Sequence, residues 1–179
     1  MAKYVLSLPV ILFPYTLLFA LCCLYTGFLM EPVFQNNGYL LLLALALCFV
    51  VAAVFAVIVA VGAIARASDG VCMARLTMVI KFCHVPAYVA IFVLGILFTL
   101  SVWGILFVVV FVLFDCAAIG MTGLIGAAAV YRNYREKHLP AGSSVLFGIV
   151  QFVFCADLVA CVMSYARSRK AARAPRMES

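Results

Sequence analysis

Apolar residues dominate this chain in four long runs that short polar stretches separate. The runs cover about residues 4–30, 39–65, 76–131 and 144–166. About 20 consecutive apolar residues are enough to cross the hydrocarbon core of a bilayer, and the third run is long enough to cross it twice. The pattern therefore predicts an integral membrane protein with about five spans, at residues 5–30, 39–65, 76–98, 103–131 and 143–166.

The spans are predicted to be helices. Residues 40–43 and 108–112 are apolar at every position, whereas the strands of a membrane barrel alternate with a period of two. We therefore expect an all-α polytopic bundle that forms a single integral membrane domain over residues 1–179. An alternative division of residues 76–131 into three short spans needs a break near Asp115.

The net charge of +6 comes from basic residues at the ends of the apolar runs. This placement is typical of cytoplasmic membrane loops and does not indicate nucleic acid binding. It favours a cytoplasmic N-terminus, and together with the resemblance described below to bacterial proteins it leads us to expect a location in the bacterial cytoplasmic membrane. Five spans then send the basic tail, residues 167–179, to the opposite side. The tail is translocated, or the last segment is re-entrant, or the number of spans differs by one; on the cytoplasmic side, the tail could bind anionic lipid headgroups.

The eight cysteines form no C-x-x-C pair, and most lie within apolar runs. In such surroundings cysteine behaves as a small hydrophobic residue. We expect no disulfide framework, no metal site and no cofactor.

Four acidic or basic residues and one glutamine lie inside predicted spans, where an ionisable side chain costs a few kcal/mol or more if it faces lipid. Asp115 and Asp157 fall near the middle of their spans. Lys81 and His84 are three residues apart, and so they share a helix face. A helical rise of about 1.5 Å per residue places all of them in one layer of spans 3–5. The predicted polar site consists of Lys81, His84, Asp115, Gln151 and Asp157.

Two interpretations of this layer stay open. In the first, Lys81 reaches up to the interface, each aspartate is buried against a hydroxyl or an amine, and the polar groups hold the helices together. In the second, the layer binds an ion, a proton or a substrate near the midplane, as in transporters. No catalytic motif is visible, so the sequence favours a protein that is not an enzyme.

Two prolines are expected to kink their helices. A proline inside a helix removes one hydrogen bond and frees a carbonyl about one turn earlier. Pro14 lies in the first span, and Pro86 lies two residues after His84, where it frees a carbonyl near Phe82. A kink at Pro86 could open a cavity beside Lys81.

Small residues recur along one face of the fourth span. They let two helices approach closely, and the partner is either a segment of this chain, such as that around Gly148, or another protomer. We favour packing within the chain. The predicted packing residues are Cys116, Gly120, Gly123, Gly126 and Ala127.

Residues 73–81 and the motifs His84-Val85-Pro86, Phe114-Asp115-Cys116 and Phe154-Cys155-Ala156-Asp157 resemble small bacterial multi-span membrane proteins of unassigned function. The resemblance covers about residues 73–166 and implies an architecture but no mechanism. The leading hypothesis is a transport-type protein or an accessory of one. The alternatives are a structural subunit that packs on a second copy or a membrane partner, and an intramembrane enzyme.

Overall fold

The structure is a computed structural model that describes residues 2–65, 69–101, 104–153 and 156–173. This part of the chain is helical and contains no strand, which confirms the all-α prediction. The elements are α1 (Ala2–Leu6), α2 (Leu8–Thr26), α3 (Gly38–Ile64), α4 (Gly70–Thr99), α5 (Ile105–Arg135), α6 (Ala141–Val150) and α7 (Ala156–Arg173).

In the described part of the chain, four helical segments are long and apolar enough to cross a membrane, and the protein is a small integral membrane protein. They are Tyr4–Thr26, Gly38–Ile64, Gly70–Thr99 and Ile105–Arg135. They correspond to the first four predicted spans, so residues 76–131 form two helices rather than three. The first helix ends before residue 30, because Gly27 takes a left-handed conformation with φ of 69° that suits glycine at a helix end. The predicted turn at residues 102 and 103 lies outside the described residues.

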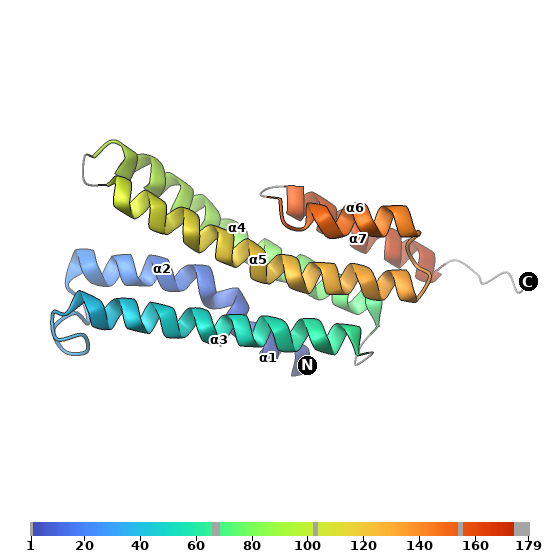
Figure 1. Ribbon diagram of the computed structural model, residues 1–179, viewed down its shortest axis with the longest axis horizontal. Coiled ribbons are helices and arrows are strands. Elements are labelled where there is room, and N and C mark those ends of the chain that lie inside the picture. Colours follow the sequence, from blue (N-terminus) through green and yellow to red (C-terminus); the bar gives the residue numbers. More distant parts are fainter. Residues whose placement is uncertain (1, 66–68, 102–103, 154–155, 174–179) are drawn as a thin grey trace, which may run out of the picture.

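The predicted fifth span, residues 143–166, is not one continuous helix. The chain leaves α6 after Val150 and turns back into α7, so that the two helices form a hairpin (Figure 1). The ten residues of α6 extend for about 15 Å, which is half of a hydrocarbon core of about 30 Å. Non-helical backbone is tolerated at such a depth only where protein covers it. Gln151 at the break is buried, whereas the side chains of Phe152 and Val153 are half exposed.

The hairpin removes the conflict over the basic tail. The C-terminal end of α7 returns to the end of the bundle from which α4 starts and at which α5 stops (Figure 1). Arg167, Arg169 and Arg173 therefore lie at the same end as Arg132 and Arg135. Residues 174–179 of the tail lie outside the described residues.

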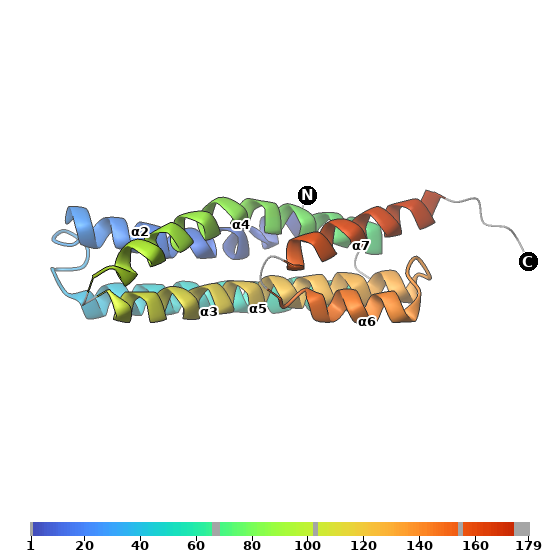
Figure 2. The ribbon, with the colours of Figure 1, turned by 90° about the horizontal axis from the view of Figure 1, so that it is seen from above.

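The helices form two layers. Figure 2 shows α2, α4 and α7 in one layer and α3, α5 and α6 in the other. Close packing between α3 and α5 depends on small side chains, since alanines lie at the contact and allow the backbones to approach. Core residues contributed by α2, α3, α4 and α5 include Val10, Phe13, Ala52, Ala56, Ala60, Leu76, Ile80, Ile125 and Ala129.

Candidate functional site

A buried ion pair joins α4 to the tip of the α6–α7 hairpin. The Nζ atom of Lys81 lies 2.9 Å from Oδ2 of Asp157, and the two side chains are only 3% and 9% exposed. One of the two interpretations expected Lys81 to reach the membrane interface. The burial of its side chain contradicts that expectation. Its Nζ also donates to the backbone carbonyl of Gln151 at 3.4 Å. This carbonyl belongs to the residue that directly follows α6, at the break before α7.

Asp157 has a second source of positive potential. It stands in the first turn of α7, and the N-terminal end of a helix carries a partial positive charge. The carboxylate therefore lies between the ammonium of Lys81 and the start of α7. A continuous fifth helix over the same residues would place no helix end at this depth.

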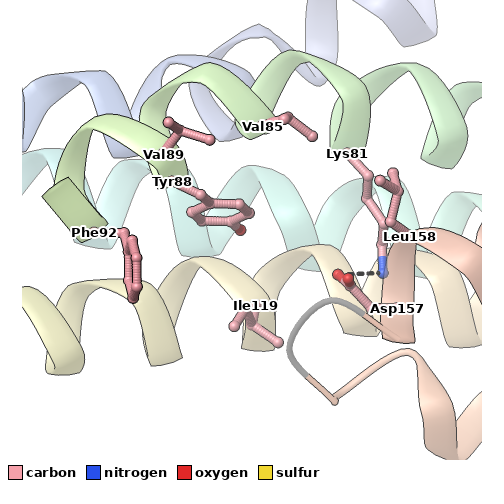
Figure 3. A pocket seen from close by; sticks show the side chains of 8 residues that line it. All are labelled: Lys81, Val85, Tyr88, Val89, Phe92, Ile119, Asp157 and Leu158. Carbon is pink, nitrogen blue, oxygen red and sulfur yellow. Dashed lines mark hydrogen bonds and ion pairs between the residues drawn. The ribbon is translucent and has the colours of Figure 1, made fainter.

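The ion pair borders a cavity of about 380 Å³ between α4, α5 and the start of α7 (Figure 3). Lys81 and Asp157 lie at one end of this cavity and Phe92 lies at the other, with the ring of Tyr88 between them (Figure 3). The remaining walls are aliphatic. The lining residues are Lys81, Val85, Tyr88, Val89, Phe92, Ile119, Asp157 and Leu158. We call this space the α4–α5 cavity.

His84 points away from the ion pair, toward α2. Its Nε2 atom lies 3.0 Å from the carbonyl oxygen of Val10. That carbonyl is four residues before Pro14, which lacks the N–H group that would otherwise occupy it. Because a carbonyl only accepts, Nε2 donates, and in the neutral ring Nδ1 accepts from the Tyr88 hydroxyl at 3.2 Å.

A second bond runs from α2 to α4 in the opposite direction. The Tyr15 hydroxyl donates to the carbonyl oxygen of Cys83 at 2.6 Å. This carbonyl is next to that of Phe82, which Pro86 frees, and both prolines lie inside their helices as predicted. The two prolines thus lie where α2 and α4 exchange hydrogen bonds through backbone carbonyls.

Asp115 does not join the ion pair. It is partly exposed on α5, and its buried Oδ1 atom has no hydrogen-bond partner among the described residues. Asp115 stands on α5, whereas Asp157 stands at the start of α7. The predicted layer therefore divides into three parts: Lys81 with Asp157 and Gln151, His84 with α2, and Asp115 by itself.

The small face of α5 receives the tip of the hairpin. A Cβ atom added to Gly123 would lie 2.8 Å from the ring of Phe152 and 3.1 Å from the carbonyl oxygen of Gln151, and one added to Gly126 would overlap the Gln151 side chain. A Cβ atom on Gly120 would meet nothing within 4 Å. Cys116 is exposed and Ala127 is partly buried. The contact thus uses the middle of the predicted face and the hairpin tip rather than Gly148.

Several polar residues around the site were not part of the prediction. Tyr15, Tyr88, Ser164 and Ser168 were not among the predicted site residues. Their only signal in the sequence is spacing: Tyr88 follows His84 by one helical turn, and the serines follow Asp157 at multiples of about one turn.

A scan against protein-family models found no match, and searches of curated proteins and of solved structures found none either. The site is therefore interpreted from its own geometry.

Proposed function

We propose that this membrane protein is of the transport type and that the α4–α5 cavity is its substrate site. The observation that carries the proposal is the buried pair of Lys81 and Asp157, which forms one end of a cavity of about 380 Å³. Ligand pockets generally have volumes of about 300–1,000 Å³ and combine apolar walls with a few placed polar groups.

The break in the last segment supports this proposal. Substrate and ion sites of transporters lie near the midplane, where broken helices offer free backbone groups and helix ends to a ligand. Here the break between α6 and α7 brings the backbone carbonyl of Gln151, the N-terminus of α7 and the carboxylate of Asp157 to the ammonium of Lys81. A purely structural contact would need none of these to border a cavity.

The cavity walls favour an amphipathic substrate. Val85, Val89, Phe92 and Ile119 offer an apolar surface, while the charged pair is confined to one end. An apolar body would lie along α4, and a polar or charged group would exchange partners with Lys81 or Asp157. Such a substrate would come from the lipid phase, since Val89 and Phe92, which line the cavity, are also more than half exposed on the surface of the bundle.

We place the basic end of the bundle in the cytoplasm. With the hairpin folded back, Lys137, Arg132, Arg135 and the arginines of α7 lie at one end, in agreement with the bias of basic residues toward cytoplasmic loops. The N-terminus and the C-terminus then share the cytoplasmic side.

The alternative of a structural subunit rests on the part of the small face that the hairpin leaves open. Gly120 has free space above it and Cys116 is exposed, so a partner helix could approach there. Because the hairpin occupies Gly123 and Gly126 within the chain, this open part is short.

Uptake by reconstituted vesicles tests the proposal. Two fluorescent amphiphiles of opposite charge, 8-anilinonaphthalene-1-sulfonate and ethidium, are offered to vesicles that contain the protein. We expect faster uptake of at least one than in empty vesicles, and loss of that uptake in the double variant Lys81→Met/Asp157→Leu. The lipid-facing substitution Val93→Leu serves as the matched control. Uptake equal to that of empty vesicles for both compounds would contradict the proposal.

A further inference from the structure

A hollow of about 580 Å³ lies at the basic end of the bundle, where α4 begins and where α5 and α7 end (Figure 1). Its polar lining consists of Asp69 just before α4, Glu136 and His138 just after α5, and Arg169 and Arg173 near the end of α7. None of these residues lines the α4–α5 cavity. The hollow is therefore a separate space, and what it binds does not depend on the proposed function.

The hollow lies at the level of the lipid headgroups. Helices α4 and α5 consist of 30 and 31 residues, which extend for about 45 Å at a rise of about 1.5 Å per residue. The hydrocarbon core of a bilayer is about 30 Å thick, and the bilayer with its headgroup layers is about 40–45 Å thick. Helices of this length that cross the membrane end among the headgroups, and the hollow lies beside two such ends.

One acidic residue of the hollow is already neutralised. The Oε1 atom of Glu136 lies 2.8 Å from Nε of Arg132, and its Oε2 atom accepts a hydrogen bond from the N–H group of Gly70 at 2.9 Å. The Nδ1 atom of His138 lies 3.4 Å from the same Oε2 atom. Glu136 therefore holds the start of α4 against the end of α5 and leaves little negative charge to the hollow.

The charges that remain in the hollow are mainly positive. Arg169 and Arg173 are four residues apart, so their side chains lie on one face of α7, and both residues are exposed. Asp69 is exposed as well, and its side chain makes no cap hydrogen bond to α4. None of the ion pairs in the described part of the chain involves these three residues. Two guanidinium groups and one carboxylate are thus available to a ligand.

We propose that the hollow binds the headgroup of an anionic phospholipid from the leaflet at the basic end. The planar guanidinium group of arginine donates paired hydrogen bonds to phosphate oxygens, and two arginines one turn apart hold one phosphate between them. Basic pockets between membrane helices on the cytoplasmic side bind headgroups of this kind. Arg135 and Lys170, the sequence neighbours of Glu136 and Arg169, add positive potential around the hollow.

The surface of α7 between the hollow and the hairpin tip is suited to acyl chains. Val162 stands seven residues before Arg169, an interval that keeps two residues on one helix face, and it is 38% exposed. Val159, about one turn further into the membrane, is 59% exposed. The acyl chains of a lipid held at the hollow would lie against these side chains. Free phosphate would make no such contact, and the lipid is therefore the better match to this surface.

Native mass spectrometry of the full chain, released from micelles of a neutral detergent, tests the site. It measures the affinity for the first bound molecule of phosphatidylglycerol and, separately, of phosphatidylcholine. We expect the wild-type protein to prefer phosphatidylglycerol, and Arg169→Gln/Arg173→Gln to lower that affinity about tenfold or more while the affinity for phosphatidylcholine stays unchanged. Both arginines are exposed, so these substitutions leave the packed core intact. Equal affinity of the wild-type protein for the two lipids would overturn the proposal.

The matched control is Arg135→Gln/Lys170→Gln, which removes the same charge from the same end of the bundle. Neither residue lines the hollow, so this variant should lose less than about threefold in affinity, the share of general electrostatic attraction. An equal loss in the two double variants would show that phosphatidylglycerol responds only to net charge, and the site in the hollow would be rejected.

Two further measurements place the phosphate and identify its source. Asp69→Asn removes the free carboxylate of the hollow and should tighten the binding of phosphatidylglycerol, because a carboxylate repels a phosphate. Weaker binding in this variant would contradict the placement of the phosphate in the hollow. A large molar excess of inorganic phosphate should leave the bound lipid in place. Displacement of the lipid by phosphate would show that the hollow takes a soluble anion, and it would overturn the lipid site.

Discussion

Helix α4 makes two buried polar contacts only one turn apart, and they differ in kind. Toward α7, Lys81 and Asp157 form a charged pair at the border of a cavity. Toward α2, His84 and Tyr15 form neutral hydrogen bonds to backbone carbonyls, and His84 does not line the cavity. The comparison shows that polar groups at one depth serve different purposes. The α2 contact joins two spanning helices, whereas the α7 contact holds a short hairpin beside an open space.

The largest loss in the free energy of unfolding is expected when one partner of the Lys81–Asp157 pair is removed. Asp157→Leu leaves the ammonium of Lys81 buried without a counter-charge, and removing one partner of a buried pair costs about 3–5 kcal/mol. We expect a loss of that size in the free energy of unfolding, measured by denaturation with sodium dodecyl sulfate in mixed micelles.

The double variant Lys81→Met/Asp157→Leu is the control for this loss. Apolar replacement of both partners is often neutral or stabilising, so the unfolding free energy should return to within about 1 kcal/mol of the wild-type value. A double variant as unstable as the single one would mean that the pair is required for the fold rather than for a site.

Hydropathy predicted the first four spans correctly, but it did not predict the break in the last apolar segment. The runs 39–65 and 76–131 predict helices because lipid leaves few alternatives to them. The segment 143–166 is equally apolar, and hydropathy alone does not tell one span from two half-spans. The difference comes from a tertiary contact, since Lys81 and the small face of α5 hold the break at Gln151 in place.

The site was predictable in its residue types but not in its pairings. Helical rise predicted one polar layer, and the structure does pair Lys81 with Asp157, although Asp157 stands in the first turn of α7 rather than in the middle of a continuous span. Which neighbour each side chain contacts depends on helix rotation and packing, which the sequence does not reveal. His84 accordingly turned toward Val10, and Asp115 did not enter the ion pair.

A substitution where the hairpin tip packs on α5 should lower the free energy of unfolding by an intermediate amount. In Gly123→Ala the new methyl group would press on the ring of Phe152 and on the carbonyl oxygen of Gln151, and overpacking of this kind costs about 1–3 kcal/mol. That carbonyl also accepts from Lys81, so the variant should weaken the charged contact and leave the α2 contact intact.

Gly120→Ala is the matched control, one turn away on the same helix. Its new Cβ atom meets nothing within 4 Å, and alanine is favoured over glycine in a helix by up to about 1 kcal/mol. Limited proteolysis of the loop between α5 and α6, together with the unfolding free energy, checks both variants. Equal destabilisation by the two substitutions would show that α5 loses stability for a reason other than its contact with the hairpin.

The smallest loss in the free energy of unfolding is expected at the hydrogen bond between His84 and Val10. A double-mutant cycle tests why this bond contributes to stability. His84→Leu removes the donor to Val10 and should cost about 0.6 kcal/mol, and at most about 1.7 kcal/mol, which are the average and the largest values for hydrogen bonds between membrane helices. The carbonyl of Val10 needs that donor because Pro14 has no N–H group. In Pro14→Ala, the amide of residue 14 can occupy the carbonyl within α2.

His84→Leu should therefore cost measurably less in the Pro14→Ala background than in the wild type, by the unfolding free energies of the four proteins of the cycle. The difference would show that His84 replaces a missing backbone bond, and uptake by vesicles should survive in the Pro14→Ala/His84→Leu protein. Additive effects of the two substitutions would instead give His84 a role beyond the bond to α2. The hydrogen bond between His84 and the hydroxyl of Tyr88, which lines the cavity, would then link the α2 contact of α4 to its α7 contact. The two contacts would no longer be independent of each other.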